Sequence, residues 1–263
     1  MTSDATSTST SRVRALAGAE VRLLLRNRTV AVSSLLVPVG LGVLCAFPVR
    51  TEGGPVAFAV VIALQLALVL GIGVYATVTQ TLVVRRQTRV LERMRTTCLA
   101  DAELLIATVL PIVLLGLAQL AVFAVVDVLT GVPAPADPVP LVLAVVGGLA
   151  WGITAGLATG VATPTPERAR ITTLPMVFVL LGAAIVLAIA PLGGWWQALV
   201  VVPGGAVGQL ARLAMTGTTW EAALGGLPAV VPALIALVAW PVVFGVLAVR
   251  RFRWGPRHRP RGA

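Results

Sequence analysis

The sequence predicts an all-α integral membrane protein with six transmembrane helices. Three observations lead to this fold class: the composition is 58% hydrophobic and only 11% charged, apolar runs of membrane-spanning length recur along the chain, and arginine gathers in alternate connecting segments. Soluble domains carry about a quarter charged residues. The mean hydropathy of +0.98 therefore excludes a water-soluble domain, and we expect a single membrane domain over residues 12–249.

Six apolar runs are long enough to cross the membrane, because about 30 Å of hydrocarbon needs roughly 20 helical residues. The predicted spans are residues 30–48, 56–80, 104–126, 139–163, 171–190 and 227–249. Five prolines inside these runs are tolerated in membrane bundles, and they predict kinks at Pro38, Pro111, Pro175, Pro232 and Pro241.

The position of the charges predicts the orientation. The net charge is +10, but the arginines sit in short clusters beside apolar runs, within residues 12–28, 85–95, 168–170 and 250–261, which argues against a nucleic-acid-binding surface. Cytoplasmic loops are enriched in arginine. The predicted protein therefore lies in the plasma membrane with both termini in the cytoplasm, and only Arg50 and Arg212 fall on the outer side.

The two ends of the chain flank this domain. Residues 1–11 are of low complexity and predict a disordered tail, and residues 250–263 form a basic cytoplasmic tail. Between the first tail and the first span, residues 12–28 have an apolar side opposed by arginines, which predicts an amphipathic helix at the membrane surface. Glu20 is a lone acid near the apolar edge of this helix, and Arg22 and Arg26 belong to its polar side.

The outer segment between the fifth and sixth spans, residues 191–226, predicts a short helical hairpin. Trp195 to Val202 is apolar but too short to span, Pro203 with two glycines turns the chain, and residues 206–215 are mildly amphipathic. Two half-helices entering the outer leaflet are one interpretation. A surface loop with Trp195 and Trp196 in the interfacial aromatic belt is the other.

Several kinds of chemistry are not supported by the sequence. A phosphate-binding Gly-x-x-x-x-Gly-Lys-Ser/Thr loop requires lysine, and the chain has none. The single histidine, His258, lies in the basic tail. The spans hold almost no ionisable group besides Asp127 at an outer end, which disfavours ion-coupled transport, and Gln65, Gln80 and Gln119 are interpreted as helix-packing residues. We expect no catalytic residue, bound metal or cofactor in this chain.

A glycine ladder marks the fourth span. Gly148, Gly152, Gly156 and Gly160 recur every four residues and form one side-chain-free strip, which permits close approach of another backbone. The partner is either another helix of the same chain, or a second subunit or moving seam.

The loop between the second and third spans has a pattern of its own. In a helix, arginines 85, 89 and 93 form one row, and Leu91, Met94 and Cys98 form an apolar edge beside it. Asp101 is a predicted cap for the third span and Glu103 lies in its first turn. An orientation signal that also binds anionic lipid would explain the arginines but not the apolar edge. A docking helix for a cytoplasmic partner would explain both.

Three stretches resemble the ABC-2 family of exporter permeases, in particular the daunorubicin-resistance type of bacterial multidrug permease. They are R22-L-L-L-R-N-R with the proline-containing span that follows, the loop L91-E-R-M-R-T-T-C-L, and residues 191–213 with Trp195, Trp196 and Pro203. The chain departs from the family pattern at Cys98, where the family has proline, and at Thr88-Arg89, which replaces an acidic-Arg-Gly element.

The resemblance implies a type V exporter-like permease that exports a hydrophobic or amphipathic small molecule, a drug or antibiotic. It implies pairing with a second permease subunit, identical or different, and docking of ATP-binding-cassette subunits that hold ATP and magnesium. The interfacial helix from Arg12 to Arg28 would help frame the docking site, with Glu20 as a candidate partner contact, and a short inner loop, residues 164–170, would be a second, smaller contact. The loop from Arg85 to Glu103 would be the coupling element, and its candidate residues are Arg89, Leu91, Glu92, Arg93, Met94, Arg95, Leu99 and Glu103. The alternative is a six-span membrane enzyme or scaffold without an ATPase.

Overall fold

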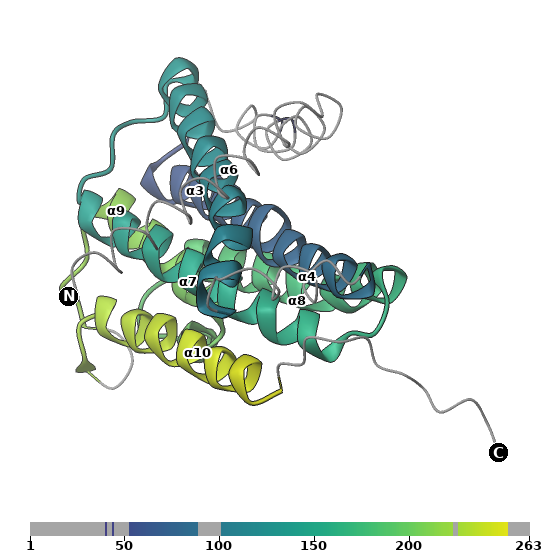
Figure 1. Ribbon diagram of the computed structural model, residues 1–263. Coiled ribbons are helices and arrows are strands. Elements are labelled where there is room, and N and C mark those ends of the chain that lie inside the picture. Colours follow the sequence, from purple (N-terminus) through teal and green to yellow (C-terminus); the bar gives the residue numbers. More distant parts are fainter. Residues whose placement is uncertain (1–39, 41–43, 45–52, 89–100, 223–225, 252–263) are drawn as a thin grey trace, which may run out of the picture.

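The computed structural model describes Gly40, Leu44 and residues 53–88, 101–222 and 226–251, with the side chains of residues 101–104 excepted. Within these residues the chain is helical apart from loops and one isolated bridge between Ala222 and Pro228, as the fold class predicts. The elements, seen in Figure 1, are α3 (Pro55–Leu68), the π-helix η2 (Val69–Ala76), α4 (Thr77–Gln87), α6 (Asp101–Thr130), α7 (Pro138–Ala162), α8 (Pro166–Ile189), the 3-10 helix η3 (Trp195–Val201), α9 (Pro203–Thr216) and α10 (Val230–Arg251).

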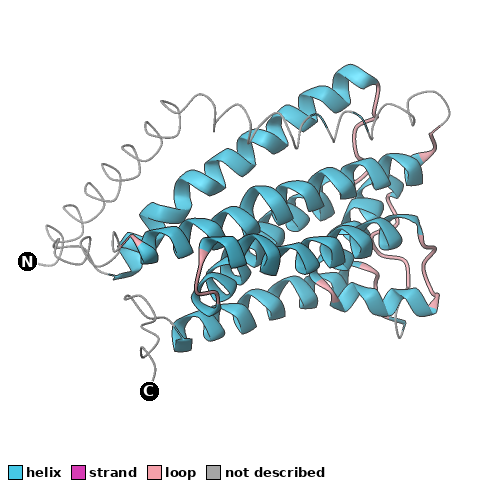
Figure 2. Cartoon of the chain, turned by 90° about the vertical axis from the view of Figure 1, so that its right-hand side faces the viewer, coloured by secondary structure: helices cyan, strands magenta, loops and turns pink. Residues whose placement is uncertain are grey.

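The described residues contain five helices long and apolar enough to cross a membrane, or six if the bent pair η3 and α9 counts as one span. α3, η2 and α4 form the first of these as one rod, Pro55–Gln87. The long helices run side by side with their axes roughly aligned (Figure 2), and α6 and α10 lie on opposite sides of the bundle (Figure 1). The predicted helix over residues 12–28 and nearly all of the predicted first span, 30–48, lie outside the described residues.

The helices differ from the predicted spans mainly at their inner ends. α4 continues past residue 80 to Gln87, and α8 begins at Pro166 instead of 171. Both α7 and α8 start with proline directly after a capping residue. Asp137 Oδ1 accepts a hydrogen bond from the Val139 amide at 3.0 Å, and Thr165 Oγ1 accepts one from the Arg168 amide at 3.4 Å. Each Asp-Pro or Thr-Pro pair therefore sets where its helix begins.

α9 is the central short helix, in contact with α3, α7, α8 and α10. Every residue from Pro203 to Ala211 is buried, and the preceding η3 meets α9 at a bend of 113°. The surface-loop interpretation of this segment is therefore wrong for α9. Its many glycine and alanine residues weaken the apolar signal in the sequence, yet they are what allow it to fit among four larger helices.

Glycines bring α9 directly onto the backbone of α8. A Cβ atom placed on Gly204 would lie 2.1 Å from the Leu180 carbonyl oxygen, and one on Gly208 would lie 2.0 Å from that of Ala184. No side chain fits at such distances, so both positions require glycine. This G-x-x-x-G pair produces the close helix contact known from membrane bundles.

The glycine ladder of α7 packs against the α3–η2–α4 rod of the same chain. A Cβ on Gly148 would meet the Leu70 side chain at 2.4 Å, and one on Gly156 would meet the Tyr75 carbonyl oxygen at 2.9 Å. Gly152 and Gly160 face Val74 and Leu82. Of the two alternatives for the ladder, the structure therefore places a helix of the same chain on the strip.

Candidate coupling site

The inner end of α4 is held by one buried arginine. Arg86 is only 4% exposed, and its guanidinium donates hydrogen bonds to the carbonyl oxygens of Val161, at 3.1 Å, and Thr163. We call these two bonds the Arg86 clamp. A buried cation is tolerated when hydrogen bonds replace its hydration, so the clamp holds the end of α4 firmly on the end of α7.

Pro164 explains why carbonyl oxygens are available at this point. The last carbonyls of a helix have no partner within it, and a residue that precedes proline adopts an extended conformation. Thr163 is extended, with φ −91° and ψ 130°, and ends α7. The carbonyl groups of the final turn are thereby presented to the guanidinium of Arg86.

Two neighbours of Arg86 extend the same junction. Arg85 donates to the hydroxyl of Thr108 on α6 at 3.2 Å, and the side-chain amide of Gln87 donates to the Pro164 carbonyl oxygen at 3.3 Å. The last turn of α4 therefore joins α6, α7 and the loop that leads to α8. Residue 89, where the predicted coupling loop continues, follows this turn directly.

Deeper in the bundle, polar contacts fasten the rod to α7. The Thr79 hydroxyl lies 3.1 Å from the Gly156 carbonyl oxygen. The Tyr75 hydroxyl lies 3.3 Å from that of Thr159, and the Tyr75 ring packs on Trp151 with centroids 5.5 Å apart. These bonds cross the glycine ladder, so α4 and α7 form a continuous unit from the Arg86 clamp to the middle of the bundle.

At the opposite end of the bundle, side chains of the hairpin donate hydrogen bonds to the carbonyl oxygens at and just after the end of α8. Arg212 on α9 donates to the carbonyl oxygens of Ile189 and Ala190, and the Trp196 indole donates to that of Pro191 at 2.8 Å. The Trp195 side chain is 81% exposed. Pro203 occupies the first turn of α9. The hairpin thus has Trp195 exposed, while Trp196 and Arg212 bond it to the end of α8.

A family model described as ABC-2 family transporter protein matches residues 48–250. The chain belongs to the ABC-2 transporter family. Neither a curated protein nor a solved structure matches it. The ABC-2 membership and the apolar helices together make this chain a multi-pass membrane component of an ABC transporter.

Most predicted site residues of this ABC-2 permease lie outside the described part of the chain. They include Glu20, Arg22, Arg26, Arg89, Leu91, Glu92, Arg93, Met94, Arg95 and Leu99. α6 begins at Asp101, so Asp101 and Glu103 both lie in its first turn, and their side chains are not described. Among the described residues, no group of three or more His, Cys, Asp or Glu side chains could hold a metal ion.

The sequence placed Arg86 within the predicted coupling element, Arg85 to Glu103, but did not single it out from the other arginines there. One feature could have done so in this ABC-2 permease: Thr163-Pro164 ends the helix whose glycines face α4. Gln65 and Asp127, interpreted as packing residues, form a hydrogen bond of 2.8 Å between α3 and α6.

Proposed function

We propose that this chain is the membrane-spanning permease subunit of an ATP-driven exporter that moves a hydrophobic or amphipathic compound, a drug or antibiotic, outward. ATP and magnesium bind to a separate ATP-binding-cassette subunit. A second permease subunit, of the same or a different sequence, completes the transporter. The ABC-2 family membership supports the class of transporter, and the lack of lysine in the whole chain supports a separate ATPase.

The Arg86 clamp is the observation that carries the proposed mechanism. A partner that binds residues 89–99 acts on the last turn of α4, which is bonded through Arg86, Arg85 and Gln87 to α7, α6 and the loop before α8. Movement of the partner on ATP binding then displaces several helices together. Such a shift between two bundle arrangements requires differential contacts of the partner with each.

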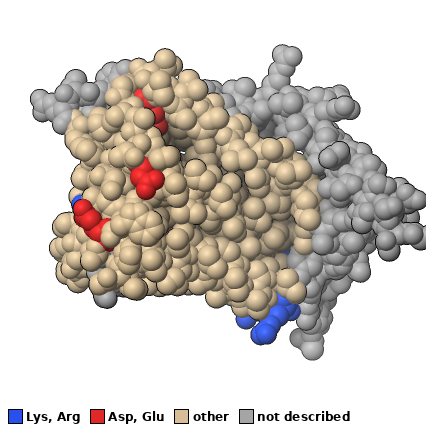
Figure 3. All heavy atoms as spheres, turned by 90° about the vertical axis from the view of Figure 1, so that its left-hand side faces the viewer, with Lys and Arg blue, Asp and Glu red and all other residues tan. Residues whose placement is uncertain are grey.

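The charge distribution supports a cytoplasmic location for this end of the bundle. Arg85, Arg86 and the arginines at the start of α8 and the end of α10 lie at the clamp end of their helices. Asp137 and Glu221 lie at the hairpin end. Figure 3 shows acidic side chains toward one end of the molecule and most basic side chains toward the other. The excess of arginine on the cytoplasmic side of membrane proteins favours the clamp end as the docking face.

Binding of the purified chain to its ATPase tests the proposal. Simultaneous replacement of Glu92, Arg93 and Leu99 by alanine removes charged and apolar contacts of the coupling loop, and we expect loss of ATPase binding and of substrate-stimulated ATP hydrolysis. The matched control replaces Arg250 and Arg251, which are exposed at the same end of the bundle, and retains binding.

Two results would contradict the proposal. Unchanged ATPase binding by the triple variant would favour the membrane enzyme or scaffold. Transport by the chain alone, driven by a proton gradient, would exclude an ATP-driven permease.

A further inference from the structure

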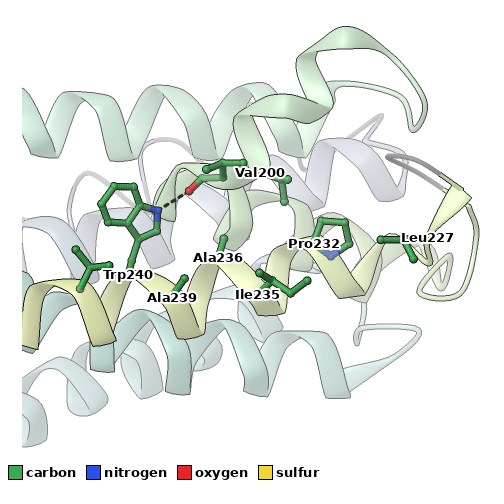
Figure 4. Close-up of a pocket in the computed structure, with 9 residues that line it drawn as sticks. Val200, Leu227, Pro232, Ile235, Ala236, Ala239 and Trp240 are labelled. Carbon is green, nitrogen blue, oxygen red and sulfur yellow. Dashed lines mark hydrogen bonds between the residues drawn. The ribbon is translucent and has the colours of Figure 1, made fainter.

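A pocket of about 430 Å³ lies between η3 and the part of α10 from Pro232 to Val243 (Figure 4). Val200 and Val201 of η3 form one wall, and Ile235, Ala239 and Val243 of α10 form the other. Its volume is within the range of small-molecule sites, roughly 300–1,000 Å³. The coupling mechanism proposed above makes no use of this pocket.

The pocket offers no free hydrogen-bonding side chain to a ligand. Its lining side chains are aliphatic except for Trp240. The indole N–H of Trp240 donates to the Val201 carbonyl oxygen at 2.5 Å, and this bond is drawn in Figure 4. A polar ligand would lose its hydration without compensation here, so the chemistry of the pocket selects a hydrocarbon group.

The pocket opens sideways out of the bundle. Val200 and Ala236 at its floor are 1% and 6% exposed, whereas Ile235 and Val201 at its rim are 60% and 58% exposed. α10 is a membrane-spanning helix with only 22% of its apolar window buried. The rim therefore faces the hydrocarbon of the bilayer, so acyl chains are the molecules that reach the opening.

The length of the pocket fits one leaflet. Along α10 it extends from Pro232 to Val243, which is roughly 17 Å at 1.5 Å per residue. The hydrocarbon core of a bilayer is about 30 Å thick, so the pocket reaches from the hairpin end to about the middle of the membrane. The exposed side chains of Trp195 and Trp220, at 81% and 77%, belong to the same end and suit the headgroup region.

We propose that this pocket binds one acyl chain of a phospholipid from the leaflet next to the hairpin. The acyl chain lies along α10 with its end near Val243, and it fills the space between η3 and α10. Such a lipid adds apolar contacts to η3. Binding needs neither ATP nor a partner subunit, so it is measurable whether or not the proposed export function is correct.

Photo-crosslinking of the full chain tests the proposal. The purified protein is placed in nanodiscs of phosphatidylethanolamine and phosphatidylglycerol with a trace of phosphatidylcholine that carries a diazirine in the middle of one acyl chain. After irradiation, mass spectrometry locates the adducts. We expect them to concentrate at Val201, Ala239 and Val243 rather than at Val238, which is 65% exposed but does not line the pocket.

Two variants of α10 form a matched pair. Ala239→Phe fills the pocket and excludes about two methylene groups of the chain, so adducts at Val201 and Val243 fall about tenfold. Val242→Phe adds the same ring at an exposed position outside the lining and leaves them unchanged. Thermal unfolding tests whether both variants are folded. If Ala239→Phe does not fold, Val201→Trp replaces it, because it blocks the pocket from η3.

Three results would overturn the proposal. Even labelling of Val238, Val242 and the pocket would mean that the pocket is ordinary lipid-facing surface. Adducts that persist in Ala239→Phe would mean that the chain lies elsewhere. Adducts at Val238 but none at the pocket residues, in nanodiscs that hold two copies of the protein, would mean that a second copy covers the pocket.

Discussion

Arg86 on α4 donates a hydrogen bond to the carbonyl oxygen of Thr163 at the end of α7, and so joins two residues 77 positions apart in the chain. In the proposed permease this bond lies between the ATPase docking loop and the bundle. A cation at the end of a membrane span usually serves orientation. Here burial and hydrogen bonding give it a second task, which is to hold two helix ends together.

The first prediction concerns Arg86. Arg86→Met keeps most of the side-chain bulk but removes the hydrogen bonds of the guanidinium to the carbonyl oxygens of Val161 and Thr163, and a hydrogen bond to a charged group contributes about 1.5–3 kcal/mol. We expect a lower unfolding temperature in detergent and weaker coupling of ATP hydrolysis to transport. The control Arg251→Met, at an exposed position, leaves both unchanged. An Arg86→Met protein with wild-type stability would contradict the role of the clamp.

The second prediction compares two glycines near the contact of α8 and α9. Gly208→Ala places a Cβ 2.0 Å from the Ala184 carbonyl oxygen, so the helices must separate, and such overpacking costs about 1–3 kcal/mol. Gly182 of α8 has open space around its Cβ position, and Gly182→Ala stabilises the helix by up to about 1 kcal/mol. Thermal unfolding of both variants measures the difference. Equal destabilisation by the two would show that α9 does not pack as described.

The third prediction ranks two positions of the glycine ladder. Gly148→Ala meets the end of the flexible Leu70 side chain, whereas Gly156→Ala meets the backbone carbonyl of Tyr75 at 2.9 Å. A side chain can change rotamer and a backbone cannot, so Gly156→Ala should be the more destabilising variant, by about 1 kcal/mol or more. Urea or heat unfolding in detergent checks the order. The reverse order would argue against the observed register of α4 on α7.

The fourth prediction concerns the hydrogen bond between Gln65 and Asp127. Gln65→Leu removes the donor of the 2.8 Å bond between α3 and α6, and a bond to a charged group contributes about 1.5–3 kcal/mol. We expect faster amide hydrogen exchange in the second half of α6. A double-mutant cycle with Asp127→Leu, which removes the acceptor, isolates the interaction energy. If that energy is close to zero, the two side chains act independently.

The long helices were predictable because apolar length alone identifies a span, as α7 and the predicted run at 139–163 illustrate. A short helix at α9 was one interpretation of the sequence, but its burial was not predictable, since Gly204 and Gly208 carry no hydrophobic signal and become informative only against the carbonyl groups of α8. The contacts of Arg86 were not predictable either, because the sequence of a helix end does not tell which carbonyl oxygens lie near it. The role of the coupling loop from Arg85 to Glu103 stays a prediction.

The continuous rod from Pro55 to Gln87 sets a condition on chain length. Each residue of an α-helix turns the chain by about 100°. Loss of a single residue between Thr77 and Arg85, in the α-helical end of the rod, would leave the rod apolar and long enough to span. It would nevertheless turn Arg86 roughly a quarter of a revolution away from Thr163. The number of residues in this span therefore determines whether Arg86 reaches its partner. Insertions or deletions here should be far less tolerated than exchanges of one aliphatic side chain for another.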